Sequence, residues 1–97
     1  MKSYALPEAE IMIDQIMRYL NAESGRKFGV RTKRSRDLVE ILYLLGYNNE
    51  HIKRVIDLKV RQWGRDEKKK KNLRPQTLFG TAHFREYLFE ATQSLNH

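Results

Sequence analysis

The sequence contains no cysteine, and only two prolines and five glycines are scattered along its 97 residues. Disulfides and thiolate metal sites are therefore excluded, and the composition fits a reducing compartment. No apolar run approaches the roughly 20 residues of a membrane-spanning helix, since the longest extends only from Ile41 to Leu45. The first residues also lack the apolar segment of a secretory signal. We expect a cytoplasmic protein that does not contact membranes.

The sequence also lacks the patterns that catalysis requires. The spacing of its three histidines does not place two imidazoles on one helix face, so a zinc site is not indicated. Gly25 and Gly29 do not lead into a Gly-Lys-Ser/Thr phosphate loop. Asp66 and Glu67 are adjacent and flanked by basic residues, which is typical of solvated charge and not of an acid–base pair. We therefore expect neither an enzyme nor a bound cofactor or metal ion.

What is present is a globular composition with helical periodicity. Hydrophobic side chains make up 40% of the residues. They recur at spacings of three and four, and no segment sustains the two-residue alternation of a strand. The sequence therefore predicts an all-α fold, a small single-domain bundle of about four helices with an irregular basic loop before the last helix. We expect one domain over residues 1–97, with a tail at 1–6, a core at 7–91 and a frayed end at 92–97.

Two helices are predicted in the first half of the chain. The first runs from about Pro7 to Ala22, because proline suits a first helical turn and Gly25 provides a stop. The second begins at a cap formed by Thr32 or Ser35 and ends at Gly46. Its predicted buried stripe consists of Leu38, Ile41, Leu42 and Leu45.

Two more helices are predicted in the second half. Asn48 or Asn49 caps the third helix, and a glycine at position 64 closes it. Its buried positions are Ile52, Val55, Ile56, Lys59 or Val60, and Trp63. The charged segment 66–72 continues as a helical turn or forms a solvated loop, and the chain starts afresh at Pro75. Thr81 caps the last helix, whose apolar positions are Phe84, Tyr87, Leu88 and Ala91.

The charge is strongly polarised along the chain. The net charge is +7, yet residues 26–74 hold 16 of the basic residues against six acidic ones, so the flanking segments are net negative. A domain with such a field attracts nucleic acid or another polyanion. Solubility alone is the other explanation of this charge.

Two basic clusters stand out within this region. The first surrounds the loop before the second helix and continues into the start of that helix, where free backbone amides favour a phosphate. It consists of Arg26, Lys27, Arg31, Lys33, Arg34 and Arg36. The second cluster joins the basic residues of the third helix to the run Lys68, Lys69, Lys70 and Lys71. Because lysine runs suit backbone contact more than base recognition, we expect salt-sensitive binding with weak sequence preference; ordinary surface charge is the alternative.

The aromatic residues are candidates either for base stacking or for the core. Three of them fit the predicted buried stripes and are assigned to the core: Trp63, Phe84 and Tyr87. Phe28, Phe79 and Phe89 remain open between the two roles. The predicted contact with nucleic acid therefore rests on charge and not on stacking.

From Ile13 to Tyr87 the order of motifs resembles the conserved C-terminal domain of phage and prophage replication (replisome organiser-like) proteins. The similarity is carried by Tyr19-Leu20-Asn21, Ser24-Gly25-Arg26-Lys27-Phe28, Thr32-Lys33, Val55-Ile56-Asp57-Leu58-Lys59, Trp63, Leu73-Arg74-Pro75-Gln76-Thr77-Leu78-Phe79-Gly80, Phe84 and Tyr87-Leu88. The Arg-Pro-x-Thr-Leu-Phe segment is its most specific part. Physically, this segment predicts a structural clamp in which Leu78 and Phe79 pack and Arg74 pairs with an acid across the chain.

The resemblance implies a role in phage DNA replication in a bacterial host cell, and it supplies no catalytic activity. In that family the domain follows an N-terminal winged-helix region, so we expect either an excised domain or a short relative. The favoured mechanism is binding of the DNA backbone by the first cluster, with Lys68 to Lys71 as a second contact. The alternative is a protein-binding module that docks a replicative helicase or helicase loader, to recruit it or to inhibit host replication. Strandedness, oligomeric state and the identity of a partner stay open.

Overall fold

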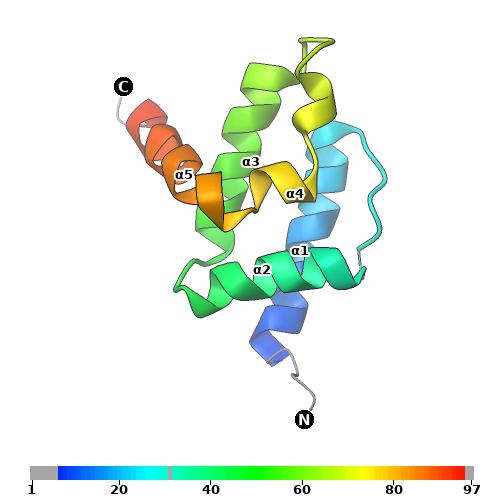
Figure 1. Ribbon diagram of the computed structural model, residues 1–97, viewed down its shortest axis with the longest axis vertical. Coiled ribbons are helices and arrows are strands. Elements are labelled where there is room, and N and C mark those ends of the chain that lie inside the picture. Colours follow the sequence, from blue (N-terminus) through cyan, green and yellow to red (C-terminus); the bar gives the residue numbers. More distant parts are fainter. Residues whose placement is uncertain (1–6, 31, 96–97) are drawn as a thin grey trace.

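The computed structural model describes residues 7–30 and 32–95 (Figure 1). It contains no strand within these two ranges, and the all-α prediction is confirmed. The elements are α1 (Pro7–Ser24), α2 (Lys33–Leu44), α3 (Asn49–Trp63), a 3-10 turn η1 (Lys70–Asn72), α4 (Pro75–Leu78) and α5 (Thr81–Leu95). Four long helices match the predicted number, and α4 is a single additional turn where the sequence predicts that the chain starts afresh.

α1 and α3 form the centre of the molecule. α1 packs against α2 and α3, α3 packs against α5, and the short α4 contacts α2, α3 and α5. In Figure 1, α1 and α3 run along the long axis, α2 crosses them, and α5 diverges towards the C-terminus. Every helix contributes to the core, which includes Ile13, Ile16, Met17, Leu20, Val39, Leu42, Ile52, Val55, Ile56, Leu78, Phe79 and Phe84. This shared core fixes where the connecting segments leave the helices.

Most helix ends follow local sequence signals. Thr32 caps α2 and Asn48 caps α3, each side chain accepting a backbone N–H of the first turn. Gly25 and Gly46 follow α1 and α2 with φ values of +74° and +99°. Only glycine adopts this left-handed region without strain, so both positions end their helices as predicted.

Three predicted ends differ in detail. α1 extends two residues beyond Ala22, to Ser24. Gly64 follows α3 but keeps a helical φ of −62°, so it does not close the helix by a left-handed turn. α5 begins at Thr81 itself, and the carbonyl oxygen of the preceding Gly80 accepts the Phe84 N–H at 3.0 Å. The residue at the capping position is therefore Gly80, and the prediction of a Thr81 cap is wrong.

The buried face of α2 also differs from the prediction. Ser35, Val39 and Leu42 are buried, whereas Ile41 and Leu45 are 44% and 61% exposed. Two helical phases were open to this sequence, because both sets of residues recur at spacings of three and four. The observed phase is stabilised by the Ser35 hydroxyl, which accepts a hydrogen bond from Thr32 Oγ1 at 3.0 Å and so can be buried. The predicted stripe is consequently turned outward except at Leu42.

A buried cation joins α3 to α5. Lys59 is only 4% exposed, and its Nζ lies 4.8 Å and 4.3 Å from the ring centroids of Trp63 and Tyr87. The same Nζ donates hydrogen bonds of 2.9 Å to Gln62 Oε1 and Glu90 Oε1. Cation–π attraction strengthens when the cation is desolvated, so this arrangement allows a lysine to occupy a core position. Lys59, and not Val60, is the buried member of the pair that the sequence left open.

The segment after the 3-10 turn η1 acts as an anchor for the last helix. Leu73, Leu78 and Phe79 are almost completely buried, and Pro75 occupies the first turn of α4. Arg74 Nε donates a hydrogen bond of 3.1 Å to Thr77 Oγ1. Among the side chains described, those of residues 10–30 and 32–93, Arg74 forms no ion pair with an acid, and its hydrogen bond to Thr77 is local to α4.

Candidate nucleic-acid interface

The basic connection between α1 and α2 (residues 25–30 and 32) is held by Asn21. The Asn21 side-chain amide donates to the Phe28 carbonyl oxygen and accepts the Phe28 N–H, both at 2.9 Å. Ser24 adds a second tie, since its Oγ accepts the Arg26 N–H at 3.2 Å. Phe28 and Val30 are partly buried against the core. This segment therefore follows a path fixed by α1, although it has no regular secondary structure.

Two cations project from the basic connection. The guanidinium of Arg26 lies 5.4 Å from the centroid of the Phe28 ring, and Arg26 is partly buried. Lys27 is exposed. Arg31, which belongs to the same predicted cluster, lies outside the described residues. The ring of Phe28 thus supports a cation and packs on the core, which accounts for this aromatic without base stacking.

The first turn of α2 concentrates positive charge. It contains Lys33, Arg34 and Arg36 and no acidic residue. Cations at a helix N-terminus oppose the positive end of the helix dipole, which is unfavourable unless an anion is bound. Lys33 and Arg34 are exposed, and Lys33 Nζ forms a solvent-open ion pair of 3.0 Å with Asp37. A phosphate at this helix start would meet these side chains and the free amides of the first turn.

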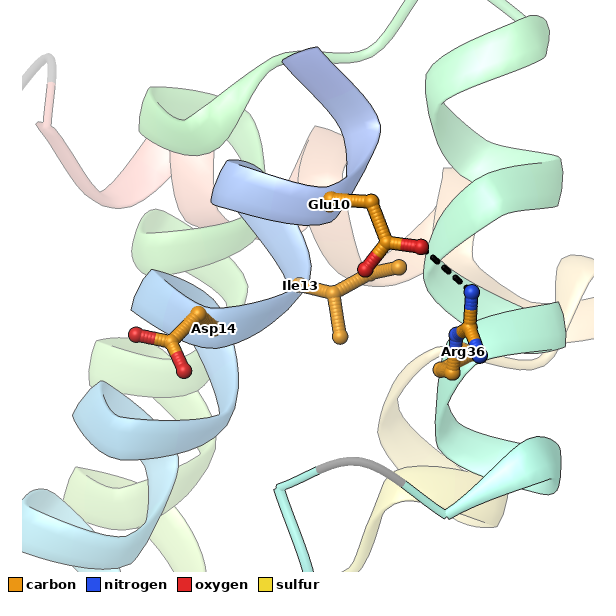
Figure 2. Close-up of a pocket in the computed structure, with 4 residues that line it drawn as sticks. All are labelled: Glu10, Ile13, Asp14 and Arg36. Atoms are coloured by element: carbon orange, nitrogen blue, oxygen red, sulfur yellow. Dashed lines mark hydrogen bonds and ion pairs between the residues drawn. The ribbon is translucent and has the colours of Figure 1, made fainter. Parts of the chain in front are cut away.

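Arg36 forms an ion pair that joins two helices, whereas the ion pair of Lys33 lies within α2. Its guanidinium reaches from α2 to the Glu10 carboxylate on α1, and both side chains are about half exposed, at 43% and 41%. Figure 2 shows this pair with Ile13 next to it and with the Asp14 carboxylate pointing away from it; these four residues line a small cavity. The cavity of about 30 Å³ has room for about one water. The primary role of Arg36 is therefore to stabilise the contact between α1 and α2, and contact with a ligand is secondary.

The lysine turn (residues 66–72) is organised by Asp66. The Asp66 carboxylate accepts the backbone N–H groups of Lys68 and Lys69 at 2.9 Å and 3.2 Å. The Asp66 carbonyl oxygen accepts those of Lys69 and Lys70 at 3.1 Å and 2.8 Å. All four lysines of the run, 68–71, are exposed. In these hydrogen bonds Asp66 binds the backbone of the turn and not the lysine head groups. The turn thus presents four positive side chains on a fixed backbone.

Figure 1 shows how the two basic segments are arranged. The lysine turn lies at one end of the long axis, and the basic connection descends along the margin of the molecule below it. The extents of the molecule are 43 × 28 × 20 Å, and the view is along the shortest axis. The depth that separates the two segments therefore cannot exceed about 20 Å. Both segments also lie within residues 16–89, the span that matches a known protein family.

Residues 16–89 match the model of a family described as conserved phage C-terminus. The chain belongs to the conserved phage C-terminus family. Neither curated proteins nor solved structures gave a match. The matched span extends from the middle of α1 into α5, and it includes the basic connection, the first turn of α2 and the lysine turn.

Several motif residues within the family span turn out to tie helices together. Tyr19 Oη on α1 donates a hydrogen bond to Asp57 Oδ1 on α3. Burial, followed by this hydrogen bond to Asp57, raises the pKa of the Tyr19 hydroxyl well above its ordinary value of 10. Lys53 Nζ lies 5.3 Å from the centroid of the same ring. These residues stabilise the α1–α3 contact.

Two positioning residues were missed by the sequence analysis. Asn21 was noted only as part of a motif, and Asp66 only as solvated charge. An asparagine four residues before a helix-ending glycine, and an aspartate two residues before a lysine run, are the signals that could have identified them. Neither signal is specific, because asparagine and aspartate make such local hydrogen bonds in many loops.

The remaining candidate groups lie mainly in the core. Phe79 and Phe84 are buried, Trp63 and Tyr87 are partly buried against Lys59, and Phe89 is 67% exposed on α5. Over residues 10–30 and 32–93, whose side chains the structure describes, no group of three or more His, Asp or Glu side chains could hold a metal ion. None of the helices described is both long and apolar enough to cross a membrane.

Proposed function

We propose that this member of the conserved phage C-terminus family binds the phosphate backbone of DNA as an accessory module in phage DNA replication, without catalysing a reaction. The observation that supports this most is that exposed cations gather on two segments, the basic connection together with the first turn of α2, and the lysine turn, and that side-chain hydrogen bonds hold both backbones. The proposed contact residues are Arg26, Lys27, Lys33, Arg34, Lys68, Lys69, Lys70 and Lys71. Arg31 joins them from outside the described residues, and Arg36 contributes while paired with Glu10.

Electrostatics accounts for the mechanism. Each phosphate that a lysine or arginine neutralises releases condensed counterions, so binding is strong at low salt and falls steeply as salt is added. Lysine head groups carry little geometric preference for individual bases, so sequence preference is weak. Because Asn21 and Asp66 already fix the two backbone segments, less conformational entropy is lost when DNA binds.

Fluorescence anisotropy of labelled single- and double-stranded oligonucleotides across a salt series tests this proposal. Two double variants remove exposed cations from the two segments: Lys33→Ala with Arg34→Ala, and Lys69→Ala with Lys70→Ala. Each should lower the logarithmic salt slope for duplex DNA by about 1.8, at roughly 0.9 per phosphate contact. The duplex and single-stranded series together assign the preferred strandedness.

A matched control removes the same charge elsewhere. Arg54 and Arg61 are exposed on α3, and Arg54→Ala with Arg61→Ala should lower affinity only slightly and leave the slope unchanged. Equal losses in all three double variants would show that net charge alone attracts DNA. The absence of binding at low salt would overturn the proposed function.

A second candidate function is docking of a replicative helicase or helicase loader. The observation that favours it is the apolar surface of α2, where Ile41, Leu44 and Leu45 are all exposed. Binding of a purified helicase or loader that persists at high salt, and that the lysine substitutions leave unchanged, would favour this function over DNA binding.

A further inference from the structure

α2 presents an apolar stripe to solvent. Leu38, Ile41 and Leu45, here called the α2 stripe, are separated by three and four residues and therefore lie on one line along the helix. Ile41 and Leu45 are 44% and 61% exposed, and Leu38 is partly buried. The stripe spans two turns, or about 10 Å at a rise of roughly 1.5 Å per residue. This is the length over which a partner helix places anchors at i, i+3 or i+4, and i+7.

A shallow hollow lies at each end of the α2 stripe. The first is lined by Lys33, Arg34, Asp37, Leu38 and Ile41, all on α2. The second lies between α2 and α5 and is lined by residues that include Leu45, Phe84 and Arg85. The stripe thus connects two depressions, of which the first is mainly apolar and the second has both polar and apolar walls.

The charge around the α2 stripe defines the chemistry of its partner. Arg34 stands at one end and Arg85 at the other, and both are exposed. Among the residues whose side chains are described, 10–30 and 32–93, neither arginine forms an ion pair. The acid that lines the first hollow, Asp37, is already paired with Lys33. A complementary partner therefore needs apolar side chains in its centre and acidic side chains towards both ends.

We propose that the α2 stripe docks an amphipathic helix of another protein, with acidic residues flanking its apolar anchors. This inference does not depend on nucleic-acid binding, because Leu38, Ile41, Leu45 and Arg85 lie outside the proposed DNA contacts. The two activities share Arg34, so an acidic helix and DNA should compete at the start of α2.

A synthetic stapled helical peptide provides the probe. It carries leucines at i, i+4 and i+7 with glutamates on both sides, and its matched partner carries lysines in place of the glutamates. Titration of the ¹⁵N-labelled protein should shift the amide resonances around Leu38, Ile41, Leu45 and Arg85. Anisotropy of the labelled peptides should give at least tenfold tighter binding of the acidic peptide, and DNA should displace it.

Substitutions on the exposed surface complete the test. Ile41→Ser with Leu45→Ser should weaken binding of the acidic peptide at least tenfold, and Arg85→Glu should weaken it about fivefold while improving binding of the lysine peptide. Ile11→Ser is the control, because Ile11 is 60% exposed on α1 and lines a different hollow. The Arg85→Glu arm stays informative if the double variant fails to fold.

Three results would overturn the proposal. The first is the absence of resonance shifts along the α2 stripe at millimolar acidic peptide. The second is equal affinity for the acidic and basic peptides. The third is a dimer, detected by sedimentation, that Ile41→Ser with Leu45→Ser dissociates, because the stripe would then be covered by a second copy of this chain.

Discussion

Lys59 and the lysines at 68–71 lie in neighbouring parts of the chain but use the same side chain in opposite ways. Lys59 is 4% exposed and is enclosed by Trp63, Tyr87, Gln62 and Glu90. The lysines of the turn are exposed, and their backbone, not their head groups, is what Asp66 holds. A count of positive charges treats the two regions alike. Burial and partners separate a cation that stabilises the fold from cations that can meet a ligand.

The largest expected effect comes from removing the buried cation, Lys59. Lys59→Ala removes two cation–π contacts, the packing of the aliphatic stem and the hydrogen bonds to Gln62 and Glu90. We expect the free energy of unfolding to fall by about 2–3 kcal/mol, with the ion-pair part reduced because Glu90 is half exposed. Urea denaturation followed by circular dichroism measures the change.

Two further variants sharpen the interpretation of this loss. Lys59→Met keeps most of the stem and should retain about half of the lost stability. Lys69→Ala, the matched change in the lysine turn, should alter stability by less than about 0.5 kcal/mol. Equal stability of Lys59→Ala and Lys69→Ala would show that the buried cation contributes nothing.

The next largest effect concerns the hydrogen bonds by which Asn21 holds the basic connection. Asn21→Ala deletes both hydrogen bonds to the Phe28 backbone and should lower the free energy of unfolding by about 1–2 kcal/mol. Hydrogen exchange of the Phe28 amide should accelerate more than that of amides in α3, because the basic connection loosens first. Asn21→Asp retains the acceptor for the Phe28 N–H and should restore part of the protection. Unchanged exchange at Phe28 in Asn21→Ala would contradict the assigned role.

The sequence predicts the helices better than it predicts the use of their surfaces. Gly25, Gly46, Thr32 and Asn48 act over a few residues, so local rules locate the helix ends. The buried phase of α2 depends on how α1 and α4 pack, and the more apolar phase of its pattern is the one turned outward. Lys59 is accepted in the core only because α5 brings Tyr87 and Glu90 to it. Such tertiary partners leave no mark in the local pattern of α3.

The basic clusters also show what a local pattern cannot predict, namely which cations are paired. The sequence identifies Lys33, Arg34 and the lysine run as a group of cations, and the structure leaves these exposed. The sequence gives no sign that Arg36 is paired with Glu10, twenty-six residues away. Long-range pairs of this kind are set by the packing of helices, here α1 on α2. Charge density therefore finds the region of a candidate interface, and only the fold identifies its unpaired members.

The smallest expected effect is a dependence of stability on pH at the buried cation. Hydrogen bonds from Gln62 and then from Lys59 hold the pKa of the Glu90 carboxyl below its ordinary value of 4.5. The folded state consequently binds fewer protons at Glu90 than the unfolded chain does. Its contribution to stability is present above the unfolded pKa of 4.5 and is lost as the pH falls through the lower folded value.

Urea unfolding of the wild type and of Glu90→Gln from about pH 6 to about pH 3 measures this contribution by linkage. The wild type should lose several tenths of a kcal/mol more than the variant below about pH 4.5, a small difference because the Glu90 side chain is 47% exposed. Glu86→Gln is the control, since Glu86 pairs with the exposed His83 outside the Lys59 cluster. Parallel pH profiles for the wild type and Glu90→Gln would mean that the Glu90 carboxylate does not stabilise the buried cation, so that the core position of Lys59 rests on the two aromatic rings and the hydrogen bond to Gln62.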